Sequence, residues 1–157
     1  MKPKLLAIYA HDFVRIEFKA HLLKYIVLNI LLFLVPFLLG QPQLLVGTFV
    51  NLVLIYIAVN YKHKEMLPAI FLPALASVLR DTLLGPATMY LAVLMPFIWA
   101  ANGLFIMSIR AYLLKKTGVI KMFGLSSFFK AAFLFTCTLI LVAVFKFPTI
   151  LLVAMGL

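Results

Sequence analysis

Seven residues within or beside long apolar runs have side chains that could bind a small polar molecule: Gln41, Gln43, Asn51, Arg80, Asp81, Trp99 and Asn102. A carboxamide in hydrocarbon is unfavourable unless it is hydrogen-bonded, so Asn51 should face a neighbouring helix or a cavity. Gly47 and Thr48 lie four and three residues before Asn51, and on a helix the three share one face. Simple helix packing would also account for Asn51.

We predict that these seven residues line one pocket beneath the outer ends of the helices. Trp99 and Asn102 share a helical face, and Arg80 with Asp81 ends the third apolar segment on the same membrane side. Pro96 frees a backbone carbonyl before Trp99, which is tolerated where the helix faces protein or a cavity. An aromatic wall, amides and one charge of each sign would suit a small zwitterionic or heteroaromatic ligand. For Arg80 and Asp81, an interfacial ion pair or a capped helix end is the alternative.

The sequence lacks the motifs of several other kinds of chemistry. It has no GxxxxGK[ST] phosphate loop, no HExxH motif, no Ser-His-Asp set and no carboxylate in the middle of an expected span. His11, Asp12, Glu17 and His21 are typical of a solvated interfacial helix, and the single Cys137 can form neither a disulfide framework nor a thiolate cluster. We therefore expect no catalytic residues, no metal and no cofactor, and a binding subunit that borrows its energy from a partner.

The composition indicates a membrane protein. Of 157 residues, 66% are hydrophobic and the mean hydropathy is +1.20, whereas about half the residues of a soluble protein are apolar. The apolar runs are continuous and lack the alternation of a membrane β-barrel. At about 20 residues per span, the length allows five to six helices. The predicted fold is an all-α bundle of five to six transmembrane helices, preceded by an N-terminal amphipathic interfacial helix.

The chain divides into two parts, residues 1–24 and a single transmembrane helical domain, 25–157. A 3.6-residue apolar period in the first part predicts a helix on the cytoplasmic membrane surface. Its apolar stripe consists of Leu5, Tyr9, Phe13, Ile16, Ala20 and Leu23. The expected spans are 25–40, 44–60, 67–79, 87–113 and 128–145, followed by an incomplete sixth run that stops at residue 157.

The basic residues predict the orientation. The net charge is +10, and alternate connections carry twelve Lys and Arg residues on one side and two on the other. By the positive-inside rule, the N-terminus of this multi-pass protein of the cell membrane lies in the cytoplasm. The short, proline-containing third segment should cross the bilayer, because a re-entrant segment would place the charges from Arg110 onward outside. The charge therefore serves orientation, and we expect no nucleic-acid partner.

The stretch from Gln41 to Asn102 also carries a family resemblance. Its features are Gln41-Pro-Gln-Leu-Leu-Val-Gly47-Thr48-Phe-Val-Asn51, Pro68, Pro73, Gly85-Pro86-Ala-Thr and Pro96-Phe-Ile-Trp-Ala-Ala-Asn102. This stretch resembles the small substrate-binding proteins (S components) of energy-coupling-factor (ECF) transporters, and is most similar to their uncharacterised members. The first span departs from the family, since it lacks the Ala-x-x-x-Ala pattern by which many members dock on the coupling subunit.

The resemblance implies a function and partners. In that family, a six-helix protein with cytoplasmic termini holds a micronutrient near its outer face, while a membrane coupling subunit and two ATPase subunits drive transport. The implied function is uptake of a small, water-soluble, vitamin-like molecule. A non-catalytic structural or assembly subunit of a larger membrane complex, such as a redox complex, is the alternative, in which the polar residues hold helices together. A membrane-embedded enzyme is the least favoured hypothesis.

Overall fold

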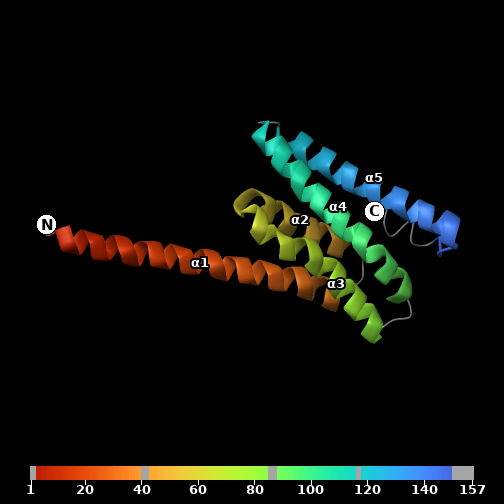
Figure 1. Ribbon diagram of the computed structural model, residues 1–157, viewed down its shortest axis with the longest axis horizontal. Helices are drawn as coiled ribbons and strands as arrows, with labels where there is room; N and C mark the ends of the chain where they lie inside the picture. Colours follow the sequence, from red (N-terminus) through yellow and green to blue (C-terminus); the bar gives the residue numbers. More distant parts are fainter. Residues whose placement is uncertain (1–2, 40–42, 85–87, 116–117, 150–157) are drawn as a thin grey trace.

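The computed structural model describes residues 3–39, 43–84, 88–115 and 118–149. These ranges contain five α-helices, one short 3₁₀ helix and no strand. The elements are α1 (Pro3–Leu38), α2 (Gln43–Asn60), η1 (His63–Met66), α3 (Leu67–Leu84), α4 (Thr88–Leu114) and α5 (Val119–Phe145). Figure 1 shows α2 to α5 as a bundle, with the C-terminal part of α1 packed against it.

Three of the described helices are long and apolar enough to cross a membrane. The segments concerned are Lys19–Leu38, Ala92–Leu114 and Val119–Phe145, and α2 adds a shorter apolar helix from Leu44 to Asn60. The chain is therefore an all-α membrane protein, as its composition predicted. The second and fourth predicted spans agree almost residue for residue with α2 and α4.

Helix α1 differs from the prediction because it continues through Lys24, where the surface helix was expected to end. Its 36 residues measure ~54 Å at ~1.5 Å per residue, against ~30 Å of hydrocarbon. Figure 1 shows its N-terminal part extending beyond the other helices. No Pro or Gly lies between Pro3 and Pro36 to interrupt the helix. The surface position of residues 1–24 stays a prediction, and it would require a bend that this helix lacks.

Two other helices are longer than predicted. Helix α3 continues past residue 79 to Leu84 and accommodates Pro73 in its interior, so this segment runs through as one helix without folding back. Helix α5 begins at Val119, although its span was expected to begin at residue 128. The segment placed in a basic loop is thus partly helical, and Lys130 lies well inside α5. The predicted sixth run falls, from residue 150 onward, outside the described residues.

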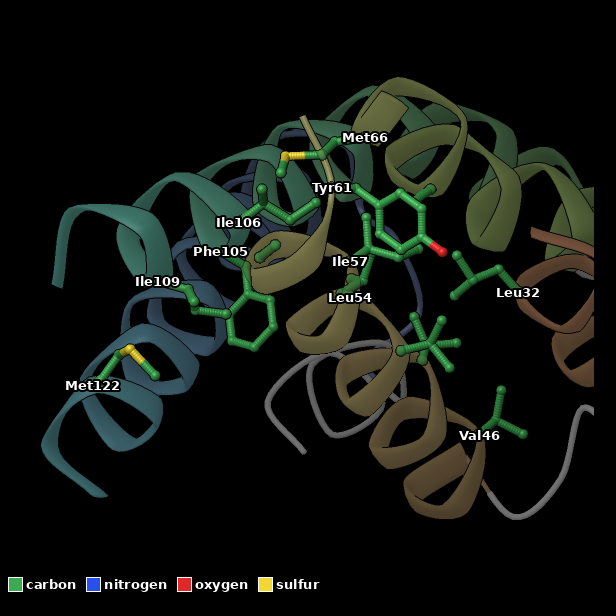
Figure 2. Close-up of a cluster of buried hydrophobic side chains, with 14 residues drawn as sticks. Leu32, Val46, Leu54, Ile57, Tyr61, Met66, Phe105, Ile106, Ile109 and Met122 are labelled. Carbon is green, nitrogen blue, oxygen red and sulfur yellow. The ribbon is translucent and has the colours of Figure 1, made fainter. Parts of the chain in front are cut away.

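Helix α4 holds the bundle together, since it packs on α2, α3 and α5, while α1 packs chiefly on α3. The main hydrophobic core gathers around the C-terminal half of α2, where Leu54 and Ile57 are fully buried against Phe105 and Ile109 of α4 (Figure 2). A smaller cluster joins α4 to α5. The N-terminal half of α2 joins this core only in part, through Val46 and Val50.

Candidate functional site

A cavity of about 420 Å³ lies beside the N-terminal half of α2. This volume falls within the range of ~300–1,000 Å³ that is typical of small-molecule sites. Helices α1 to α5 all contribute to the wall. The lining residues are Pro36, Leu44, Val46, Gly47, Thr48, Val50, Asn51, Pro73, Ala74, Ser77, Ile98, Asn102, Ser127, Phe128, Lys130, Ala131 and Leu134.

One wall of the cavity is the polar face of α2 that the sequence predicted. Gly47, Thr48 and Asn51 all line it, which follows from their spacing on a helix. A Cβ atom added at Gly47 would have no neighbouring atom within 4 Å. The absence of a side chain at this position therefore contributes open volume to the cavity and does not serve a close helix contact.

Lys130 of α5 extends into the same cavity. Its ammonium Nζ donates a 2.6 Å hydrogen bond to Oδ1 of Asn51 and lies 5.1 Å from the centroid of the Phe105 ring. A cation over an aromatic face is stabilised by the ring quadrupole. The hydrogen bond joins α5 to α2, two helices that each pack chiefly on α4. The side chain of Lys130 thus bridges the space between them.

Asn102 supplies the second amide of the cavity and is 1% exposed. Its Nδ2 donates a 3.1 Å hydrogen bond to the backbone carbonyl of Ile70 in α3. That carbonyl can accept a second hydrogen bond because it has two lone pairs. Asn102 therefore joins α4 to α3 through this hydrogen bond and also lines the cavity. It has both the helix-packing role and the pocket position that the sequence allowed.

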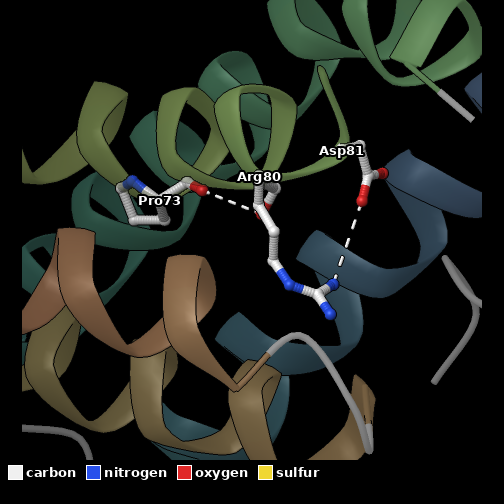
Figure 3. A network of polar contacts seen from close by, with 4 residues as sticks. Pro73, Arg80 and Asp81 are labelled. Carbon is white, nitrogen blue, oxygen red and sulfur yellow. Dashed lines mark hydrogen bonds and ion pairs between the residues drawn. The ribbon is translucent and has the colours of Figure 1, made fainter. Parts of the chain in front are cut away.

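Arg80 and Asp81 form an ion pair near the end of α3, with 3.8 Å between Arg80 Nη1 and Asp81 Oδ1 (Figure 3). This distance is too long for a hydrogen bond, and both side chains are partly exposed. One turn earlier, the Ser77 hydroxyl donates to the carbonyl of Pro73 at 3.0 Å, and both of these residues line the cavity. Arg80 and Asp81 themselves are not among the lining residues.

Trp99 also lies away from the cavity wall. Its ring packs edge-on against Phe71 of α3, with 4.9 Å between centroids, and its buried Nε1 has no hydrogen-bond partner among the described residues. Ile98 takes the wall position one turn before Asn102. Residues four apart on a helix superpose more closely than residues three apart, so Ile98 and not Trp99 shares the orientation of Asn102.

The remaining two predicted site residues cannot be placed. Gln41 lies outside the described residues, and for Gln43 the structure describes the helical backbone at the start of α2 but not the side chain. Of the seven predicted residues, the structure thus brings Asn51 and Asn102 together at one cavity. Their role in binding a substrate stays a prediction.

Sequence reasoning missed Lys130 as a residue of this site, because it was counted with the basic residues of the preceding connection. The signal that could have found it is the sequence around it, which has no Pro and no acidic residue from Val119 to Phe145 and is mostly apolar after Lys130. Lys130 is close to the middle of a span, where an ionisable residue marks a candidate functional site by default.

The described residues offer a binding site with donors and an aromatic face, and they contain no group of three or more His, Cys, Asp or Glu residues that could hold a metal. No family model matches the chain, and no curated protein or solved structure matches it either. The geometry of this cavity and the sequence itself are therefore what indicate a function.

Proposed function

We propose that the chain is the substrate-binding subunit of an ECF-type transporter, which takes up a small, water-soluble micronutrient with energy from partner ATPases. The observation that supports this most is the 420 Å³ cavity lined by Asn51, Asn102 and Lys130 within a bundle of apolar helices. Small-molecule sites combine apolar walls with a few convergent polar groups in this way.

The polar groups support a ligand site more than simple helix packing. Interhelical amides often do no more than join helices, and Asn102 does so through Ile70. Asn51 and Lys130, however, meet across a space that protein atoms leave open. Side chains that served packing alone would be expected to close such a space, because protein interiors are densely packed.

The partners are those that the resemblance implies, a membrane coupling subunit and two ATPase subunits. The chain has no phosphate-binding loop of its own, so ATP-driven transport would use the ATPases of such partners. We place the protein in the cell membrane with a cytoplasmic N-terminus. In that orientation the start of α2 and the end of α3 face outward, and the cavity lies in the outer half of the bundle.

The test is to purify the intact protein with its native membrane partners and to analyse the released small molecules by mass spectrometry. We expect a water-soluble compound at near-stoichiometric amount, together with copurifying ATPase subunits. A protein that carries no small molecule under any growth condition, and that copurifies with cofactor-bearing subunits in place of ATPases, would contradict the proposal.

A second candidate function, a structural subunit of a larger membrane complex, is favoured by α1. The N-terminal part of this helix extends beyond the bundle without another described helix beside it (Figure 1), and it carries several basic residues. Such a helix suits a docking role on another subunit or on anionic headgroups. Truncation of residues 3–18 separates the two functions: it should release the partner complex in the structural case and leave the ligand bound in the transport case.

The orientation has its own test in two single-cysteine variants, Lys64→Cys and Lys146→Cys, made in a Cys137→Ser background. Lys64 lies in η1 after α2, and Lys146 follows α5. An impermeant thiol reagent added to intact cells should label only the second variant, because a cytoplasmic N-terminus places η1 inside. Labelling of the first variant alone would reverse the orientation.

A further inference from the structure

Lys130 presents a positive charge inside the bundle without a carboxylate to balance it in the described part of the chain. Among the side chains that the structure describes, Arg80 and Asp81 form the only ion pair. Glu65 accepts a 2.8 Å hydrogen bond from the backbone N–H of Lys62, near the opposite end of α2. Neither Asp81 nor Glu65 is therefore a counter-ion for Lys130, and the other two acids, Asp12 and Glu17, lie in the N-terminal part of α1, whose side chains the structure does not describe.

The ammonium has capacity for a further acceptor. It carries three N–H donors, and one of them is directed to Asn51 at 2.6 Å. Phe105 stabilises its charge from one side but offers no hydrogen-bond acceptor. Because Lys130 lines the cavity, an acceptor that occupies the cavity can take a second of these donors.

We infer that the ligand of this cavity carries an anionic group, a carboxylate or a phosphate, and that Lys130 is its counter-ion. This inference rests on the proposed binding function and names the chemical class of its substrate. An ammonium in a low-dielectric site is strongly disfavoured unless it is paired, and charge-assisted hydrogen bonds to carboxylate or phosphate are among the strongest that a protein forms. A ligand anion would thus supply the negative charge and the second hydrogen-bond acceptor that Asn51, a neutral amide, does not provide to Lys130.

Asn51 is a positioning residue in this arrangement. Its Oδ1 holds the Lys130 ammonium at a fixed place on the cavity wall, so the flexible lysine stem is ordered before the ligand arrives. Preorganisation of this kind raises affinity by reducing the ordering that binding requires. Asn51→Asp would supply a fixed carboxylate at the same position, and this internal anion would compete with the ligand for Lys130.

The experiment compares the small molecules released from purified full-length wild-type protein and from Lys130→Gln, Lys130→Arg and Asn51→Asp, by mass spectrometry in both ion modes. We expect an anion in the wild type. Its occupancy should fall about 10- to 100-fold in Lys130→Gln and in Asn51→Asp, since a charge-assisted hydrogen bond contributes that much to affinity, and it should be largely kept in Lys130→Arg. The matched control is Lys121→Gln, which removes an exposed lysine from the same helix and should leave the occupancy unchanged.

The outcomes separate this inference from the proposed function. A retained neutral or cationic compound, or an anion retained equally by Lys130→Gln, overturns the inference and leaves the binding function in place. An anionic lipid as the retained molecule supports the counter-ion role but overturns uptake of a water-soluble substrate. No retained compound in the wild type overturns both.

Thermal unfolding of the Lys130 variants shows whether a loss of ligand reflects the binding site or a loss of folding. Gln at position 130 keeps an amide N–H donor for Asn51, and Met removes a charge that has no described carboxylate partner, so Lys130→Gln and Lys130→Met should both fold in the same detergent and unfold close to the temperature of ligand-free wild type. Lost occupancy at unchanged stability then reports on the ligand. Lost occupancy that is explained wholly by unfolding of both variants would contradict the counter-ion role and assign Lys130 to the fold.

Discussion

The two halves of α2 differ in what they face. Its N-terminal half presents Gly47, Thr48 and Asn51 to a cavity, whereas its C-terminal half buries Leu54 and Ile57 completely in the core (Figure 2). The whole helix is apolar enough that hydropathy alone would not separate the halves. The difference lies in the small and polar side chains of Gly47, Thr48 and Asn51, which leave space beside the N-terminal half, although Val46 and Val50 of the same half still pack in the core.

The C-terminal end of α2 is also held by contacts with α1 and α4. Tyr61, which follows α2, is 3% exposed and packs against the rings of His21 and Tyr25, with centroids 4.7 and 5.4 Å away. Arg110 of α4 donates to the carbonyl of Tyr61 at 2.9 Å and contacts Nδ1 of His63 at 3.1 Å. One end of α2 is thus held rigidly by several elements, and the other borders a space that a ligand can occupy.

The largest effect on stability should come from the packed half. Ile57→Ala removes a fully buried side chain and should lower the free energy of unfolding by about 2–4 kcal/mol, because the surrounding helices cannot collapse into the cavity it leaves. Leu52→Ala, on the outward face of the same helix and 60% exposed, is the control and should change stability by less than about 1 kcal/mol. Denaturant titration in detergent measures both. Equal effects would show that the two faces of α2 are not packed differently.

The next largest effect should come from the pair that spans the cavity. Asn51→Leu removes the acceptor of the Lys130 ammonium and should cost about 1–3 kcal/mol, since a partly buried, charged donor is left unpaired. Adding Lys130→Met should recover most of this loss, because no charge then requires a partner. In the unfolding measurements, a double-mutant cycle with a coupling energy near zero would contradict a stabilising hydrogen bond between Asn51 and Lys130.

A smaller effect is expected at the fastened end of α2. Arg110→Ala removes the donor to the Tyr61 carbonyl and the contact with His63, with an expected loss of about 1 kcal/mol because the site is partly solvated. Arg110→Lys should recover less than half of it, since an ammonium cannot make both contacts with the geometry of a guanidinium. Full stability in Arg110→Ala, measured by thermal unfolding, would contradict this account of the helix end.

The smallest effect should come from the ion pair at the end of α3. Arg80 and Asp81 are 3.8 Å apart and partly exposed, so Asp81→Asn should change the free energy of unfolding by no more than about 0.5 kcal/mol. If the sequence-based pocket were right to include this pair, Asp81→Asn would instead reduce ligand occupancy strongly. Occupancy and stability measured together distinguish an interfacial pair from a ligand contact.

The sequence was sufficient for the helical class and for the bounds of α2 and α4, because turn residues and charged residues border these apolar runs. It was insufficient for α1 and α5, where helix-compatible residues continue past the charges used to mark their ends. Lys24 and Lys121 are compatible with helix, and charge alone does not stop a helix; α5 continues through both Lys121 and Gly124. Hydropathy located the apolar spans more reliably than it located the helix ends.

The site was predicted in part for a related reason. Spacing within one helix identified the face of Gly47, Thr48 and Asn51, because helical periodicity is a local property. The contact between Lys130 and Asn51 joins residues far apart in the chain, and no local pattern specifies which helices meet. Whether Ile98 or Trp99 lines the cavity likewise depends on how α4 is rotated against α3, and tertiary packing sets this rotation.

The most direct test of a ligand-binding cavity is to fill it. Gly47→Phe adds a ring where a Cβ meets no atom within 4 Å, on the cavity wall, and Gly124→Phe adds the same ring at an equally open position of α5 that does not line the cavity. Mass spectrometry of the molecules released from the two purified variants, both checked for wild-type unfolding temperature, should show no bound compound in Gly47→Phe and wild-type occupancy in Gly124→Phe. A folded Gly47→Phe protein that retains its ligand in full would contradict the assignment of this cavity as the binding site.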